Sequence, residues 1–117
     1  MAWSDFTNIV RNPNHIETSI AGVAYEGRAA VSRQLQIGEQ LLLDRDVGNP
    51  YDPNAVAVVR AMDGKQIGYL PRDVAARVAA VVDQVDVSLF AVVTALFNMD
   101  RTPAVHIRFD LPTFDLP

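Results

Sequence analysis

The segment from residue 49 to residue 72 is the most informative stretch of the chain and reads NPYDPNAVAVVRAMDGKQIGYLPR. Residues 46–53, which begin just before this segment and overlap its start, are rich in turn-forming residues and predict a loop. Residues 54–61 have the apolar, β-branched composition of a strand. Asp63 and Gly64 predict a two-residue hairpin connection, because glycine accepts the positive φ that the tight hairpin turns require. The returning strand then covers residues 65–70.

A helix is predicted directly after this hairpin, over residues 72–83. Pro71 ends the second strand and suits the start of a helix, where its fixed φ is already helical. Asp73 lies in the first turn, on the favourable side of the helix dipole. The apolar residues recur at helical spacing and form one buried face: Val74, Ala75, Val78, Val81 and Val82.

The rest of the chain predicts further short strands around this hairpin. One or two helical turns are expected within residues 28–35. Strands are expected at residues 19–25, 40–44, 87–96 and 104–109. The fold class is therefore mainly β with one or two helices, arranged as a small β-barrel of about six strands or a strongly coiled sheet.

The expected core consists of the apolar positions of these strands and of the inner helix face. Its members are Val23, Leu41, Leu43, Val56, Val58, Ile67, Leu70, Val78, Val82, Val92 and Ile107. Three parts of the chain are distinguished: an N-terminal arm over residues 1–17, a domain over 18–110 and an extended tail over 111–117.

Composition limits the function further. The chain has 117 residues, which suits one domain, and it contains no cysteine, which excludes disulfides and thiolate metal sites. Its net charge of −4 argues against coating of duplex DNA or of an anionic membrane. No apolar run is long enough to span a bilayer and no secretion signal is recognisable, so a cytoplasmic protein without membrane attachment is expected.

Catalytic and metal-binding patterns are missing from the sequence, so no enzyme, no cofactor and no metal is expected. The only histidines are His15, in the arm, and His106, within a strand pattern. Asp44, Asp46 and Asp52 do not follow the spacing of a calcium loop and are interpreted as a solvated turn. No serine lies in a nucleophile-elbow context.

Polar and aromatic residues of the 49–72 segment form the one constellation that suggests binding. Asn49, Tyr51, Asp52, Tyr69 and Arg72 fall at the ends of neighbouring predicted strands. Each has a structural alternative, such as turn capping for the amide and the carboxylate. The arginine has one too, an exposed ion pair with a neighbouring carboxylate such as Asp73. Together, aromatic faces and hydrogen-bonding groups are typical of sites for single-stranded nucleic acid.

The same segment resembles the HIRAN domain family over residues 20–109. The resemblance lies in AGVAYEGR at residues 21–28, LLLDRD at 41–46, NPYDPNAVAV at 49–58 and QIGYLP at 66–71. It implies a fold related to the OB barrel, with about six strands and two helices. It also implies an activity, the binding of the free 3′-hydroxyl end of single-stranded DNA in a surface pocket.

Carried over position by position, the resemblance assigns the DNA-binding residues. Tyr25 would stack on a terminal base. Asn49, Tyr51 and Asp52 would form the pocket, with Asp52 accepting the 3′-hydroxyl proton. The full implied set is Tyr25, Asn49, Tyr51, Asp52, Tyr69 and Arg72.

The chain also departs from a DNA-binding member of the family at several positions. Ala24 stands where that member has an arginine, Tyr69 where it has a histidine and Arg72 where it has a lysine. Phe97 or Arg101 is nearest to its last aromatic residue.

Two functions remain open from the sequence. The first is a binding module for single-stranded DNA 3′ ends, acting in DNA repair or replication. The second is a protein-interaction or adaptor domain that keeps the fold without the DNA site. In either case the protein partner expected is a separately encoded helicase or nuclease. Arg60, predicted to lie on the hairpin away from the loop, is expected to take no part in DNA binding.

Overall fold

The structure is a computed structural model that describes residues 13–25, 27–85 and 87–113. Most of the expected arm and the last part of the expected tail therefore lie outside the described residues.

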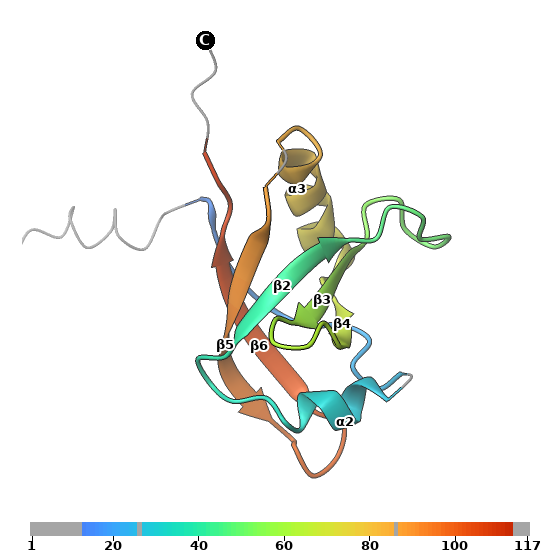
Figure 1. Ribbon diagram of the computed structural model, residues 1–117, viewed down its shortest axis with the longest axis vertical. Helices are drawn as coiled ribbons and strands as arrows, with labels where there is room; N and C mark the ends of the chain where they lie inside the picture. The colour runs from blue at the N-terminus through green and yellow to red at the C-terminus, as the bar shows by residue number, and fades with distance from the viewer. Residues whose placement is uncertain (1–12, 26, 86, 114–117) are drawn as a thin grey trace, which may run out of the picture.

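Six strands and two helices make up the described chain (Figure 1). The predicted helices correspond to α2 and α3, and five of the six predicted strands are found within two residues of their expected ends. In chain order the elements are β1 (His15–Ser19), α2 (Arg28–Ser32), β2 (Gln40–Arg45), β3 (Val56–Arg60), β4 (Gln66–Tyr69), α3 (Arg72–Val82), β5 (Leu89–Phe97) and β6 (Ala104–Asp110).

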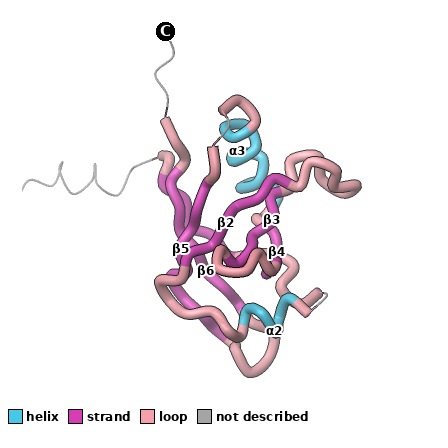
Figure 2. The backbone as a smooth tube through the Cα atoms, in the orientation of Figure 1, coloured by secondary structure: helices cyan, strands magenta, loops and turns pink. Residues whose placement is uncertain are grey.

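All six strands belong to one antiparallel sheet in the order β1-β6-β5-β2-β3-β4. The sheet curls into a half-barrel, and the two helices lie at opposite ends of it (Figure 2). Ala21, just beyond β1, brings the two ends of the sheet together. It exchanges two backbone hydrogen bonds with Tyr69 of β4, at N–O distances of 2.8 and 2.9 Å. The expected fold class, mainly β with two helices in an OB-like barrel, is confirmed.

Gly68 permits this closure because its backbone lies directly against residues 20 and 21. A Cβ atom at this position would overlap the carbonyl oxygen of Ala21 and the side chain of Ile20. Only glycine allows two backbones to approach so closely. The glycine of the predicted returning strand is therefore required for packing rather than for a turn.

The first strand was predicted too late in the sequence. The structure places β1 at His15–Ser19, inside the segment expected to be an arm, where it pairs with β6 from His15↔Asp110 to Ser19↔His106. Residues 22–25 instead form a turn, in which Gly22 has a φ of 73°. Apolar alternation runs through both halves of this segment, and the turn at Gly22 ends pairing before the second half.

The predicted two-residue hairpin is also wrong, because residues 61–65 connect β3 to β4. Gly64 does adopt a positive φ, 74°, and its amide donates to the carbonyl of Arg60. Arg60 itself is only 3% exposed. Its guanidinium forms an ion pair with Asp63 at 2.5 Å and donates to Gln34 Oε1 at 2.9 Å. Arg60 is thus a structural residue, and replacing it would disturb the fold whether or not it takes part in DNA binding.

The core contains most of the predicted residues, with one error and one partial burial. Val92 is outside it, because the alternation of β5 turns Ala91 and Val93 inward. Val82 is partly buried and packs against the core from α3. The core also contains residues that the expected core did not include, among them Ala75 of the predicted helix face and several residues of the predicted last two strands: Ile16, Ile20, Leu35, Ala75, Leu89, Ala91, Val93, Val105, Phe109 and Leu111. No helix in the described part of the chain is both long and apolar enough to cross a bilayer.

Candidate functional site

A pocket of about 250 Å³ lies between the loop after β2, the end of β4 and the start of α3. It is called the Asn49 pocket below. Five of the six residues implied by the resemblance line it, and Tyr25 does not. The lining residues are Ala21, Asn49, Tyr51, Asp52, Ala55, Tyr69, Leu70, Pro71 and Arg72.

The side chain of Asn49 stabilises the turn of the loop that follows it. Its Oδ1 accepts hydrogen bonds from the backbone amides of Tyr51 at 2.8 Å and Asp52 at 3.0 Å. Asp52 repeats the arrangement, because its Oδ1 accepts from the amide of Asn54 at 2.9 Å. Such side-chain turns are what asparagine and aspartate form most readily. The expected capping role of both residues is therefore real, and it coexists with their position at the pocket.

Asp46 links the loop to β4. Its Oδ2 accepts from Asn49 Nδ2 at 3.0 Å and from the Tyr69 hydroxyl at 2.9 Å. These two hydrogen bonds lower the pKa of the Asp46 carboxyl, because they stabilise its charged form. The sequence suggested only a solvated turn here, since nothing in the spacing of Asp46 and Tyr69 indicates that they meet. Asp46 fixes two of the pocket residues relative to each other.

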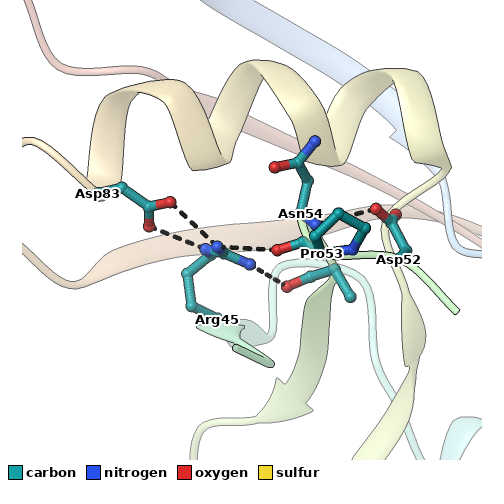
Figure 3. Close-up of polar contacts among 6 residues, drawn as sticks. Arg45, Asp52, Pro53, Asn54 and Asp83 are labelled. Atoms are coloured by element: carbon teal, nitrogen blue, oxygen red, sulfur yellow. Dashed lines mark hydrogen bonds and ion pairs between the residues drawn. The ribbon is translucent and has the colours of Figure 1, made fainter. Parts of the chain in front are cut away.

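Arg45 anchors the other end of the loop (Figure 3). It makes a two-pronged pair with Asp83 at the end of α3, at 2.9 and 3.0 Å. The same guanidinium donates to the carbonyls of Ala55 at 2.9 Å and Pro53 at 3.1 Å. The nearby arginine lowers the pKa of Asp83, chiefly through the hydrogen bond. This fork geometry, which lysine cannot provide, ties the loop to both β2 and the helix.

Arg72 is exposed at the first position of α3 and faces the loop. Its Nη2 donates to the carbonyl of Tyr51 at 2.8 Å, a different partner from the carboxylate considered in the sequence. The first helical hydrogen bond runs from Ala75 to Pro71, so the amides before Ala75 belong to the unpaired first turn. Backbone donors, the positive end of the helix dipole and a guanidinium thus coincide at one edge of the pocket.

The tyrosines differ in their surroundings. Tyr51 is 81% exposed and Tyr25 is 67% exposed, so neither is a core residue. Tyr69 is partly buried, and the guanidinium carbon of Arg28 lies 5.3 Å from its ring centroid. Tyr25 lies in the turn that leads from Ala21 to α2, where its carbonyl accepts from the Arg28 amide at 2.9 Å. That turn connects Ala21, which lines the pocket, with Arg28, whose guanidinium lies over the Tyr69 ring.

Several lining residues were not anticipated. Ala21, Ala55, Leu70 and Pro71 contribute small or apolar surfaces, and such residues carry no chemical signal in a sequence. Phe97, one possible match to the family's last aromatic residue, does not line this pocket. It lies edge-on to His106, with ring centroids 5.3 Å apart.

The two histidines lie on β1 and β6 and do not line the Asn49 pocket. His15 hydrogen-bonds Asp110 at 2.8 Å on the surface, and that contact raises the pKa of the imidazole. Histidine and carboxylate side chains nowhere gather into a group able to hold a metal ion in residues 13–25, 27–85 and 87–113.

Comparisons with known proteins show which family this chain resembles in sequence and structure. A family model described as the HIRAN domain matches residues 13–107. Human helicase-like transcription factor is 34% identical over 71 residues, which are 61% of this chain and 7% of the human protein. The chain therefore corresponds to a small fraction of that relative.

Solved structures agree with the family match. A crystal structure of a Lactobacillus plantarum protein superposes with a TM-score of 0.67 at 26% identity, covering 82% of this chain and 92% of that one. The crystal structure of the HIRAN domain of human HLTF gives 0.66 at 24% identity, covering 84% and 74%. The NMR structure of that domain in its DNA-bound conformation gives 0.55 at 22% identity, covering 83% and 73%. With a family model spanning most of the described residues and the same fold in these structures, the chain belongs to the HIRAN domain family.

Proposed function

We propose that this protein binds single-stranded DNA and receives the free 3′-hydroxyl end of the strand in the Asn49 pocket. The observation that carries the proposal is the convergence of Asn49, Tyr51, Asp52, Tyr69 and Arg72 on one pocket. A DNA-bound structure exists for a domain of the same family, the human HLTF HIRAN domain.

Asp52 supplies the selectivity for a hydroxyl. Its Oδ1 accepts from the Asn54 amide, whereas its Oδ2 accepts no hydrogen bond from any residue that the structure describes. A carboxylate oxygen accepts from a hydroxyl and repels a phosphate. A strand that ends in a 3′-hydroxyl therefore fits this position, and a strand that ends in a 3′-phosphate does not.

The groups around Asp52 would hold the last nucleotides. Tyr51 and Tyr25 offer exposed rings on which bases stack, and stacking requires no particular base. Arg72 would exchange its hydrogen bond with the Tyr51 carbonyl for a backbone phosphate at the start of α3. Binding, rather than catalysis, is the role that these groups support. A separately encoded helicase or nuclease in DNA repair or replication is the partner this role suggests.

Recognition of an end is tested by comparing linear and circular single strands of the same sequence. Fluorescence anisotropy with the purified protein should detect binding to the linear strand and much weaker binding to the circle, because the circle has no terminus for the pocket. Equal affinity for both would show that the protein follows the backbone without using its end.

One observation favours the adaptor function as a second candidate. A wider cavity of about 680 Å³ lies away from the Asn49 pocket, between the α2–β2 connection and the β3–β4 loop. Ile37 and Met62 line it and are 68% and 77% exposed. Exposed apolar side chains around a cavity are typical of protein-binding surfaces. Absence of any DNA binding in the titration above would leave this function as the better supported one.

A further inference from the structure

A third pocket, of about 290 Å³, lies where α2 approaches the beginning of β4. It is called the Lys65 pocket below. Figure 1 shows α2 next to this end of β4, on the side away from α3. Its lining residues are Gly27, Arg28, Val31, Lys65 and Gln66.

The two pockets adjoin through one pair of side chains. Tyr69 lines the Asn49 pocket, and Arg28, which lies over the Tyr69 ring, lines the Lys65 pocket. The Arg28 side chain is also fixed by a hydrogen bond, because its Nη1 donates to the Gly22 carbonyl at 3.0 Å. Lys65 directly precedes β4 and Tyr69 ends it. At about 3.3 Å per residue, the Cα atoms of these two residues lie roughly 13 Å apart. Residues 67–68 are buried, so a chain leaving the Asn49 pocket would reach the Lys65 pocket by passing over the Arg28–Tyr69 pair.

The Lys65 pocket is basic in a protein whose net charge is −4. Two of its lining side chains are cations and one is an amide, and no acidic side chain is among those described at its wall. The nearby carboxylate of Asp63 is neutralised by Arg60, which holds the pKa of Asp63 at about 2. Lys65 is exposed, and it is the one lysine of the sequence.

We propose that the Lys65 pocket binds a backbone phosphate of an inner nucleotide of the strand whose 3′ end occupies the Asn49 pocket. The inference rests on the proposed function and adds the direction of the strand, from Tyr69 toward Lys65 over the Arg28–Tyr69 pair. Arg28 and Lys65 supply the charge, and Gln66 supplies an amide that already donates to the Gly68 carbonyl at 3.1 Å. The protein would then contact several nucleotides of the strand rather than its terminus alone.

The first experiment measures affinity against strand length and salt for Lys65→Gln and for a matched control, Arg108→Gln. Arg108 is exposed on β6 and lines neither pocket. Lys65→Gln should weaken binding of a 3′-hydroxyl hexanucleotide about threefold, as expected for one exposed ionic contact. It should lower the salt slope by about one charge, and the loss should grow from dinucleotide to hexanucleotide. Arg108→Gln should change neither quantity.

The second experiment maps the contact chemically. A hexanucleotide with a free 3′-hydroxyl and an abasic aldehyde at an inner position forms an imine with an amine that it touches, and borohydride reduces the imine. Lys65 is the one lysine, so peptide mapping should find the adduct there rather than on the terminal amine. Trapping on the terminal amine alone would overturn the proposal.

The outcomes separate the two proposals. If the wild type prefers a free 3′ end while Lys65→Gln and Arg108→Gln bind alike at every length, the Lys65 pocket is not a phosphate site and the proposed function stands. If the wild type binds no single strand, both proposals fail together.

Discussion

Tyr25 lies in the turn between Ala21 and α2, and its ring is largely in solvent. Replacing it with alanine should leave the unfolding midpoint unchanged, because little packing is lost. DNA binding should weaken by about 1–3 kcal/mol for the lost stacking surface. Phe90→Ala on β5 removes another exposed ring, 48% exposed, and serves as the control in the same titration. A Tyr25→Ala protein that unfolds early and binds DNA normally would contradict the stacking role.

Arg72 tests whether an acidic protein reads a phosphate with a single guanidinium. Arg72→Ala should weaken binding for all sequences alike and reduce the salt slope by about one charge, because one phosphate contact releases about one counterion. The measurement is a titration at several salt concentrations, with Arg108→Ala as control in place of the buried Arg60. Identical behaviour of the two variants would mean that the start of α3 does not face the DNA.

At the scale of elements, the closure of the sheet depends on β4 lying against residues 20 and 21. Gly68→Ala adds a methyl group that overlaps the Ala21 carbonyl oxygen, so either β4 or the segment after β1 must shift. We expect a loss of about 1–3 kcal/mol in the free energy of unfolding, as for other overpacked positions. The measurement is chemical denaturation. Gly48→Ala, where a Cβ meets nothing within 4 Å, should change stability by less than about 0.5 kcal/mol.

Most elements were predictable because their patterns are local. The strand of residues 56–60, the helix beginning after Pro71 and the strands near 89–97 and 104–110 all follow from apolar periodicity and turn residues. β1 was misplaced because the alternation from Ile16 to Val23 fits two registers, and only pairing with β6 selects one. The loop residues 61–65 depend on the Arg60–Asp63 ion pair, which a turn motif does not reveal.

The difference between local patterns and contacts distant in sequence also explains which parts of the site could be predicted. Five of the six implied residues converge on the Asn49 pocket, because they lie in two segments joined by one hairpin. The residues that hold the pocket in shape come from further apart. Asp46 bonds Tyr69 across 23 positions, and Arg45 bonds Asp83 across 38. No single sequence displays such pairs, since each carboxylate taken alone resembles a solvated turn or helix end.

The whole molecule carries a net charge of −4, which opposes the approach of DNA. Under the proposed function, binding would therefore come from local contacts at the Asn49 and Lys65 pockets rather than from a broad electrostatic surface. The proposed hydroxyl contact at Asp52 suits such a protein, because a neutral hydroxyl can approach a carboxylate without the repulsion that a phosphate would meet. The curled sheet supports this by holding the loop, β4 and α3 together at the Asn49 pocket.

The most direct test is the ratio of affinities for two otherwise identical single strands, one ending in a 3′-hydroxyl and the other in a 3′-phosphate. The wild type should prefer the hydroxyl by roughly tenfold or more, the value of one hydrogen bond to a charged acceptor. Asp52→Asn keeps an oxygen for the Asn54 amide but replaces the free acceptor with a donor. That variant should fold normally and lose the preference. Equal binding of both ends by the wild type would contradict the account.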